Sequence, residues 1–315
     1  MEPNGVLVVG SITADVTAFS RRLPRRGETV LGEDFTLVLG GKGANQAVTA
    51  ARAGAPTWMA GCVGKDPFSD IVLSGLRSHG VNLSEIRSVD NRTGVAHIRV
   101  DASGENDIVI TPLANWDLSV EMVDDSIDAV RDRVAVLLLQ LEIRTDVARH
   151  AAEAGARAGL TTVLDPAPAQ SLPEDVWRHI DVVTPNESEA TALTGVEVVD
   201  VESAERAAAW FLERRVRHAL ITLGSSGVLS VTAERTRYFP AYPVSPVDTT
   251  AAGDAFTGSF GAALASGLDI DSAIRRGMAA GALATTVHGA SPSLPDRQSV
   301  DELISLYPSV DGGAS

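Results

Sequence analysis

Short, uninterrupted apolar runs alternate along this chain with longer segments of helical period. Runs of this kind are typical of strands that are buried on both faces of a parallel sheet. We therefore predict an α/β fold in which helices flank a central, mainly parallel sheet. The expected strands are VLVVG from Val6, VAVLLLQ from Val134, TTVLD from Thr161, DVVTP from Asp181 and ALITLG from Ala219.

Two segments depart from this alternation. TGVAHIRVDASGENDIVI, from Thr93, has two β-rich runs around a turn at residues 101–106 and predicts a hairpin. ETVLGEDFTLVLGG, from Glu28, also lacks a helical period and follows the turn-like LPRRG. We expect these segments, at about residues 14–39 and 93–112, to form a small separate sheet that acts as a lid over the active site. The alternative is that they are edge strands of the main sheet.

Polar or glycine-rich residues end each predicted strand of the main sheet. In open α/β sheets, ligands bind outside the carboxyl ends of the strands. The residues found there are the first candidates for chemistry: Asp15, Glu142, Asp165, Asn186 and Gly224.

Composition narrows the class of protein. The 315 residues are 44% hydrophobic and 21% charged, which is typical of a globular domain; we expect one domain over residues 1–310 and a flexible tail at 311–315. A formal charge of -15 disfavours nucleic acid and anionic membrane surfaces as partners. The single cysteine, Cys62, and an N-terminal apolar run too short to span a membrane favour a reducing cytoplasm.

The glycine-rich stretches give no standard nucleotide motif. GCVGKD at Gly61 and GGKG at Gly40 lack the spacing and the final hydroxyl of a phosphate-binding loop, and no Gly-x-Gly-x-x-Gly follows the first strand. The missing Gly-x-Gly-x-x-Gly disfavours a dinucleotide dehydrogenase. The scattered histidines and the lone cysteine make a zinc site improbable.

GGKGANQAVTAARAG, from Gly40, opens a predicted helix with small residues that let a ligand approach the backbone closely. Lys42 and Asn45 add a cation and an amide at that point, which suits the hydroxyl groups of a small polar molecule. The alternative is a tight turn with a solvated lysine.

DTTAAGDAF, from Asp248, has the same design and places Asp254 in the first turn of a helix. A lone acid there could simply stabilise the helix N-terminus, by about 0.3–1 kcal/mol. However, Ala251, Ala252 and Gly253 leave the backbone N–H groups uncovered, which predicts an anion pocket. Asp254 would stand beside a bound phosphate as a general base.

Together these segments resemble the ribokinase-like family of carbohydrate kinases over nearly the whole chain. The two glycine-rich signatures flank LLLQLE, DPAPA, TPNESEA and TLGSSG in the family's order and approximate spacing. The resemblance implies an α/β domain with a small β lid, the use of ATP with magnesium, and phosphorylation of the primary hydroxyl of a sugar.

The resemblance also assigns roles to residues. It implies that Asp254 is the base, at an anion pocket formed by Ala251, Ala252 and Gly253. The implied sugar contacts are Thr13, Asp15, Gly41, Lys42, Asn45, Glu142 and Asp254. The implied nucleotide contacts are Asn186, Glu189 (the acid linked to magnesium), Thr222, Leu223, Gly224, Ser225, Ser226, Gly227, Gly253 and Met278. The implied potassium loop is Asp248, Thr250, Ala284, Val287, Gly289 and Ser293.

The chain departs from ribokinases at three places. Thr13 stands where they carry Asn, Leu113 replaces the Gly of a Gly-Ala-Asn segment that here reads Leu113, Ala114 and Asn115, and Met278 replaces a polar residue beside adenine. D-Ribose is the expected substrate. The alternatives are deoxyribose, another sugar or a nucleoside, or a non-catalytic sugar-sensing role. A homodimer through the lid strands is also expected.

Overall fold

The large sheet is built as the apolar runs predict. The protein is described here by a computed structural model that covers residues 3–308, so the predicted tail at 311–315 lies outside the described residues. Within them, the sheet has nine strands in the order β13-β12-β11-β10-β9-β8-β1-β4-β5. In this order, neighbouring strands from β11 through to β5 pair in parallel, whereas β12 pairs antiparallel with both β11 and β13. The strands are β1 (Gly5–Val9), β4 (Thr57–Val63), β5 (Ile86–Ser88), β8 (Val134–Leu139), β9 (Thr161–Leu164), β10 (Val182–Val183), β11 (His218–Thr222), β12 (Gly227–Val231) and β13 (Thr236–Pro240).

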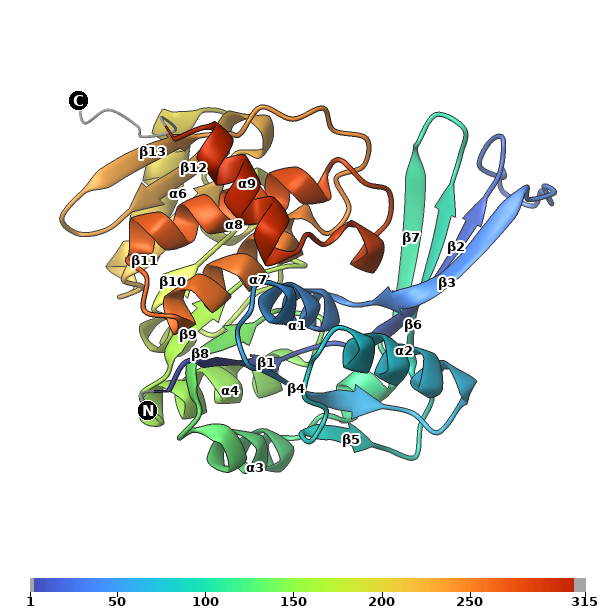
Figure 1. The fold of residues 1–315 in the computed structure, drawn as a ribbon, viewed down its shortest axis with the longest axis horizontal. Coiled ribbons are helices and arrows are strands. Elements are labelled where there is room, and N and C mark those ends of the chain that lie inside the picture. The colour runs from blue at the N-terminus through green and yellow to red at the C-terminus, as the bar shows by residue number, and fades with distance from the viewer. Residues whose placement is uncertain (1–2, 309–315) are drawn as a thin grey trace.

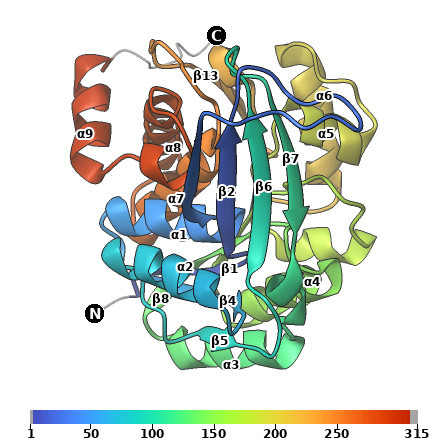
Figure 2. The ribbon, with the colours of Figure 1, turned by 90° about the vertical axis from the view of Figure 1, so that its right-hand side faces the viewer.

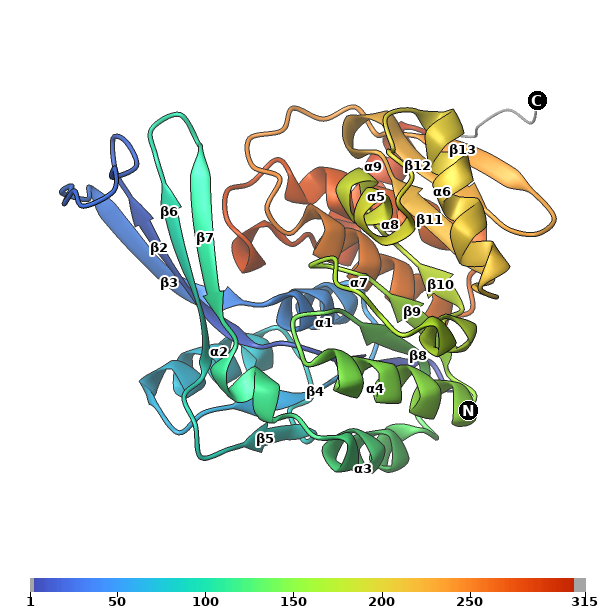
Figure 3. The same cartoon turned by 180° about the vertical axis from the view of Figure 1, so that it is seen from behind.

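Helices cover both faces of this sheet. One face carries α1, α2, α7, α8 and α9 (Figure 1), and the opposite face carries α3 to α6 (Figure 3). The helices are α1 (Lys42–Arg52), α2 (Pro67–Ser78), α3 (Val120–Val130), α4 (Thr145–Arg157), α5 (Glu187–Thr194), α6 (Val201–Glu213), α7 (Ala252–Ala265), α8 (Ile270–Ala284) and α9 (Arg297–Leu306). Within residues 3–308, none of these helices combines the length and the apolar character needed to cross a membrane.

Central strands such as β1 and β8 are buried on both sides, which explains their unbroken apolar sequences. Leu7 and Val9 of β1 pack into the core cluster under α3 to α6, whereas Val6 and Val8 pack into the cluster under α1, α7 and α8. Successive side chains of a strand point to opposite faces, so both faces must be apolar. The predicted fold class is confirmed.

A second sheet stands apart from the first, with its four strands side by side in Figure 2. Its strands are β2 (Thr13–Phe19), β3 (Asp34–Gly40), β6 (Gly94–Val100) and β7 (Asn106–Thr111). β6 and β7 form the predicted hairpin, and β2 pairs with β3 on one side and with β6 on the other. The alternative that these segments extend the main sheet is wrong.

Candidate active site

The N-terminus of α1 lies against the turn between β1 and β2. A side chain at Gly43 would come within 2.6 Å of the Ser11 backbone nitrogen, so this approach requires glycine. The Glu142 carboxylate, which follows β8, joins the two segments: its Oε2 accepts from Ser11 Oγ at 2.6 Å and from the Lys42 backbone N–H at 2.9 Å. The structure therefore brings Gly41, Lys42 and Glu142 to one place.

Asp254 reaches the same place from α7. Ala251, which precedes this helix, has a left-handed backbone (φ 60°), no side chain caps the first turn, and a side chain at Gly253 would meet open space. Asp254 is 4% exposed and accepts hydrogen bonds from Asn45 Nδ2 at 2.9 Å and from Gln46 Nε2 at 3.2 Å. The two glycine-rich signatures thus meet through their side chains.

The charges of this cluster shift one another's pKa. Burial raises the pKa of Asp254 and outweighs the stabilising effects of Lys42 and of the two amides. Burial also raises the pKa of Asp165 well above its ordinary value, against the attraction of Lys42. Burial alone would lower the pKa of Lys42, but the surrounding acids, Asp254 first, raise it. Lys42 is therefore a fixed positive charge in a site of buried acids.

Asp15 projects from β2 toward the same group. Thr13 Oγ1 donates to Asp15 Oδ1 at 2.7 Å, and both side chains are buried. Burial raises the pKa of Asp15 to about 7, with contributions from Glu142 and Asp254 that the Thr13 hydrogen bond partly offsets. A side chain at Gly40, on the neighbouring strand, would lie about 2.1 Å from the Asp15 carboxyl group, so only glycine leaves room for this acid. The hydroxyl of Thr13 is thus directed at Asp15.

The family model for pfkB family carbohydrate kinases matches residues 4–297 of this chain. The chain belongs to this family. The match spans both sheets and every predicted site segment, so the resemblance inferred from the sequence is confirmed.

Individual pfkB relatives cover almost the whole chain. A ribokinase of Haemophilus influenzae is 40% identical over 298 residues, covering 94% of this chain and 97% of its own length. A deoxyribokinase of Salmonella typhi is 33% identical, covering 96% and 99%. The solved structure of Arabidopsis thaliana ribokinase complexed with ribose and ATP is 34% identical, with a TM-score of 0.90 over 96% of this chain and 99% of that one.

The nucleotide contacts implied by pfkB kinases fall on the ends of β10 and β11. Asn186 caps α5: its Oδ1 accepts from the Glu189 backbone N–H, and Glu189 Oε2 accepts from the Asn186 backbone N–H, both at 2.9 Å. Asn186 also bridges to Thr222 at the end of β11. Glu189 contributes to the raised pKa of Lys42, so this segment adjoins the acid cluster.

The turn from Thr222 to Gly227 is shaped by two glycines with positive φ. Gly224 (φ 50°) opens a short 3₁₀ turn whose residues are exposed, and Gly227 (φ 119°) packs so closely on Phe239 that a side chain there would clash. Met278 lies on α8 and is only 6% exposed, with its side chain in the apolar core. A nucleotide contact by Met278 stays a prediction.

Hydrogen bonds link only some residues of the predicted cation loop to one another. Asp248 Oδ1 accepts from the Thr250 N–H and hydroxyl at 2.9 and 2.6 Å, and Oδ2 accepts from the Gly289 N–H at 2.8 Å. Burial tends to raise the pKa of Asp248, but these bonds together lower it. Ala284 ends α8, Val287 is exposed, and Ser293 Oγ donates to the Ala290 carbonyl at 2.8 Å.

The departure at Leu113 has a visible cost. Leu113 has a φ of 48°, the left-handed region that glycine adopts freely and that costs other residues about 1–2 kcal/mol. Asn115, two residues on, accepts from the Ile12 N–H at 2.8 Å and donates to the Ile12 carbonyl at 2.9 Å. This segment therefore fixes the turn that leads from β1 into β2.

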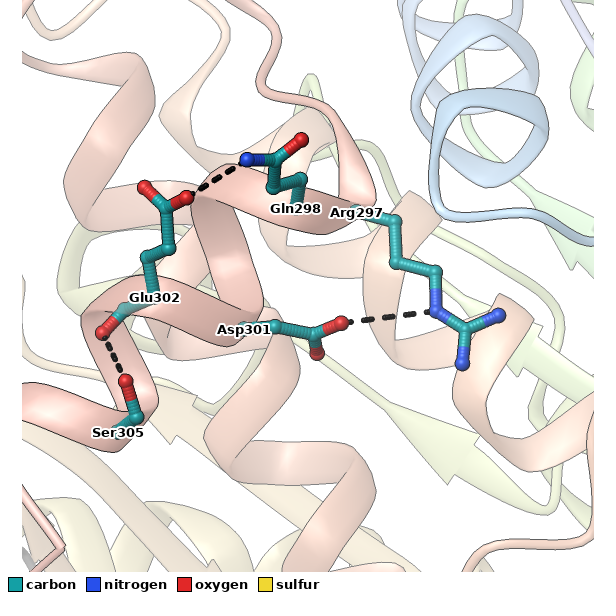
Figure 4. A pocket seen from close by; sticks show the side chains of 5 residues that line it. All are labelled: Arg297, Gln298, Asp301, Glu302 and Ser305. Carbon is teal, nitrogen blue, oxygen red and sulfur yellow. Dashed lines mark hydrogen bonds and ion pairs between the residues drawn. The ribbon is translucent and has the colours of Figure 1, made fainter.

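Sequence reasoning assigned no role to three residues at the centre of the cluster. Ser11, Gln46 and Gln140 each make a hydrogen bond to a residue more than 90 positions away, and local patterns carry no signal for such pairs. A separate hollow of about 540 Å³ lies on α9 and is lined by Arg297, Gln298, Asp301, Glu302 and Ser305 (Figure 4). None of these five residues belongs to the predicted site.

Proposed function

We propose that this protein is an ATP-dependent kinase that phosphorylates the primary hydroxyl of D-ribose to give D-ribose 5-phosphate. The observation that carries the proposal is the Asp254 carboxylate, buried and held by two side-chain amides at a helix N-terminus that no side chain caps. The names of the ribokinases that cover nearly all of this chain support ribose as the acceptor.

Asp254 takes the proton from the sugar's primary hydroxyl as that oxygen attacks the terminal phosphoryl group of ATP, and the bond from that phosphorus to the bridging oxygen breaks to release ADP. Phosphoryl transfer depends mainly on positioning and on stabilising charge spread over the equatorial oxygens. The Ala252 N–H donates to the Thr249 carbonyl at 3.2 Å, so the proposed donors for that charge are the N–H groups of Ala251 and Gly253, at the positive end of the α7 dipole. Burial raises the pKa of Asp254, which makes its carboxylate a stronger base.

The sugar would lie between α1, β2 and the loop after β8. Asn45 keeps a buried carbonyl oxygen, Oδ1, without a hydrogen-bond partner among residues 3–308, and a sugar hydroxyl can donate to it. Lys42, Gly41 and Glu142 surround the same position, and Asp15 approaches from β2. A set of donors and acceptors of this kind suits the hydroxyl groups of a pentose.

ATP would lie over the ends of β10 and β11. Asn186 and Glu189 are close to the acid cluster. The turn of Thr222, Leu223, Gly224, Ser225, Ser226 and Gly227, of which residues 224–226 are exposed, offers backbone groups for the nucleotide, with Met278 proposed near the base. A carboxylate such as that of Glu189, with water and phosphate oxygens, is a usual environment for Mg²⁺. When bound, magnesium would neutralise part of the phosphate charge.

The donor set around Asp248 fits a potassium ion. Hard monovalent cations prefer oxygen ligands, and the proposed loop offers a carboxylate with lowered pKa, the Thr250 hydroxyl and backbone carbonyls at Ala284, Val287, Gly289 and Ser293. Asp248 and Thr250 lie directly before the first turn of α7. When bound, potassium would order the backbone of the anion pocket.

Deoxyribose is the second candidate acceptor. A deoxyribokinase is among the full-length relatives, and the hydroxyl of Thr13 is engaged by Asp15, which leaves less for a sugar hydroxyl. The ratio of kcat/KM for ribose and 2-deoxyribose decides between the two.

The arrangement of the small sheet supports a lid and a homodimer. Asp15 of β2 lies level with Ala96 of β6 and Ile110 of β7, so the face that carries Asp15 continues outward through Ile110 and Ile108, which are 43% and 48% exposed. Exposed apolar strand faces favour pairing with another copy. Ile108→Glu should yield monomers in sedimentation experiments if this proposal is right. One catalytic unit, over about residues 1–310, and a cytoplasmic location complete the proposal.

Asp254→Asn tests the central claim. The amide keeps the shape but cannot accept the proton, so turnover should fall about 10²- to 10⁴-fold while calorimetry still detects ribose binding. A variant that binds ribose normally and keeps more than roughly a tenth of the wild-type rate would show that another group is the base.

A further inference from the structure

Gln46 occupies the middle of a buried chain of side chains. Its Nε2 donates to Asp254 Oδ1 at 3.2 Å and to Asp165 Oδ2 at 2.9 Å. Its Oε1 accepts from Gln140 Nε2 at 2.5 Å. Gln46 and Gln140 are both 0% exposed, so neither presents surface to a ligand.

The partners leave the Gln46 carboxamide one orientation. When Asp165 and Asp254 are ionised they only accept hydrogen bonds, so the NH₂ group then faces the two acids and the carbonyl faces Gln140. A flipped amide would set its oxygen against two acids. Each of the two N–H bonds thus holds one carboxylate, and Gln140 holds Gln46.

We propose that Gln46 is a positioning residue that fixes the Asp254 carboxylate for proton transfer; this rests on the function proposed above. Asn45 and Gln46 divide the carboxylate between them. Asn45 Nδ2 contacts Oδ2 on the side of the proposed sugar, where its own Oδ1 awaits a partner. Gln46 contacts Oδ1 from the buried side, so this hydrogen bond is kept when the sugar binds. Oδ2 is left to receive the hydroxyl proton.

A purely structural role for Gln46 predicts something different. In that case, its removal would leave buried acceptors unsatisfied and lower the free energy of unfolding, but the folded enzyme would turn over normally. A positioning role lowers kcat in folded enzyme and leaves the sugar's Kd nearly unchanged, because Gln46 does not touch the sugar.

Gln46→Met is the direct test, since methionine has a similar length and no donor. We expect kcat for ribose to fall about 10- to 100-fold, because a displacement of about 1 Å in a reacting group can cost that much. The Kd for ribose from calorimetry should stay within about twofold. Thr57→Val is the matched control: it removes one partly buried hydrogen bond, to the Ala55 carbonyl at 2.9 Å, outside the site, and should keep the wild-type kcat.

A second pair of variants separates this inference from the proposed function. In an Asp254→Asn background, adding Gln46→Met should cost no further activity, because a positioned base is no longer there to lose. A full additional loss, or an unchanged kcat for Gln46→Met alone, overturns the inference while Asp254 remains the base. Normal turnover by Asp254→Asn alone would instead overturn the proposed function.

If Gln46→Met does not fold, Gln140→Met replaces it. This change removes the donor to Gln46 Oε1 and leaves both carboxylate contacts in place. It should lower kcat roughly 3- to 10-fold with the same ribose Kd. An unchanged kcat would overturn the positioning role.

Discussion

The hydrogen bond from Thr13 to Asp15 should make stability depend on pH in a specific way. Thr13→Val keeps the shape of the side chain and removes the donor to Asp15 Oδ1. Because the folded-state pKa of Asp15 is about 7, the carboxyl is about nine-tenths ionised at pH 8 and almost fully protonated at pH 5. The lost bond is therefore charge-assisted at pH 8 and neutral at pH 5.

The sign follows from the raised pKa. A carboxyl whose pKa is raised by folding contributes most stability below its unfolded pKa of 3.8, and that contribution is lost as pH rises through about 7. Removing the donor raises the pKa further and deepens the loss. A hydrogen bond to a charged group contributes about 1.5–3 kcal/mol and a neutral one about 0.5–1.5 kcal/mol. Thr13→Val should thus be destabilising at both pH values, and by about 1 kcal/mol more at pH 8.

Urea unfolding at pH 5 and pH 8 measures both free energies. Thr13→Ser keeps the hydroxyl, so its destabilisation should not change with pH. An equal loss of stability for Thr13→Val at the two pH values would show that the Thr13 hydroxyl does not act on the ionised form of Asp15.

Three further predictions concern activity. Potassium should activate far better than sodium, and equal rates after dialysis into potassium, sodium and a bulky organic cation would exclude the cation loop at Asp248. Thr13→Asn should raise the kcat/KM ratio of ribose to 2-deoxyribose, since a lost hydrogen bond in a buried site costs about 1–3 kcal/mol; an unchanged ratio would move attention to the segment at Leu113. Gly40→Ala should displace Asp15 and weaken ribose binding measured by calorimetry, and unaltered binding would remove Asp15 from the sugar site.

The fold was largely readable from the sequence because the central parallel strands are buried on both faces. Long apolar runs such as that of β8 have no other simple interpretation. β4 was not among the predicted strands: its sequence TWMAGCV is broken by Gly61, whose lack of a side chain is required by the Gly10 carbonyl 2.8 Å from the position of a Cβ. A contact of that kind is invisible in a sequence.

The site was readable only in part. Lys42, Asn45 and Asp254 lie in glycine-rich helix starts, and local patterns mark such starts as places where a ligand can approach backbone. No local pattern marks Gln46 and Gln140, because their hydrogen-bond partners lie far along the chain. Thr13 was expected to face the sugar, but its hydroxyl is directed at Asp15.

The site holds more acids than cations, which bears on how it can bind a triphosphate. Lys42 is the cation whose pKa is raised by four acids, Asp254, Asp165, Glu142 and Glu189. A triphosphate would add further negative charge to a site that already holds more acids than this lysine can neutralise. Uncapped N–H groups at α7 offset part of that charge, by about 0.5 of an elementary charge for a helix dipole. We therefore expect the remainder to be offset by cations that arrive with the nucleotide or bind beside it, because the four acids outnumber the single lysine.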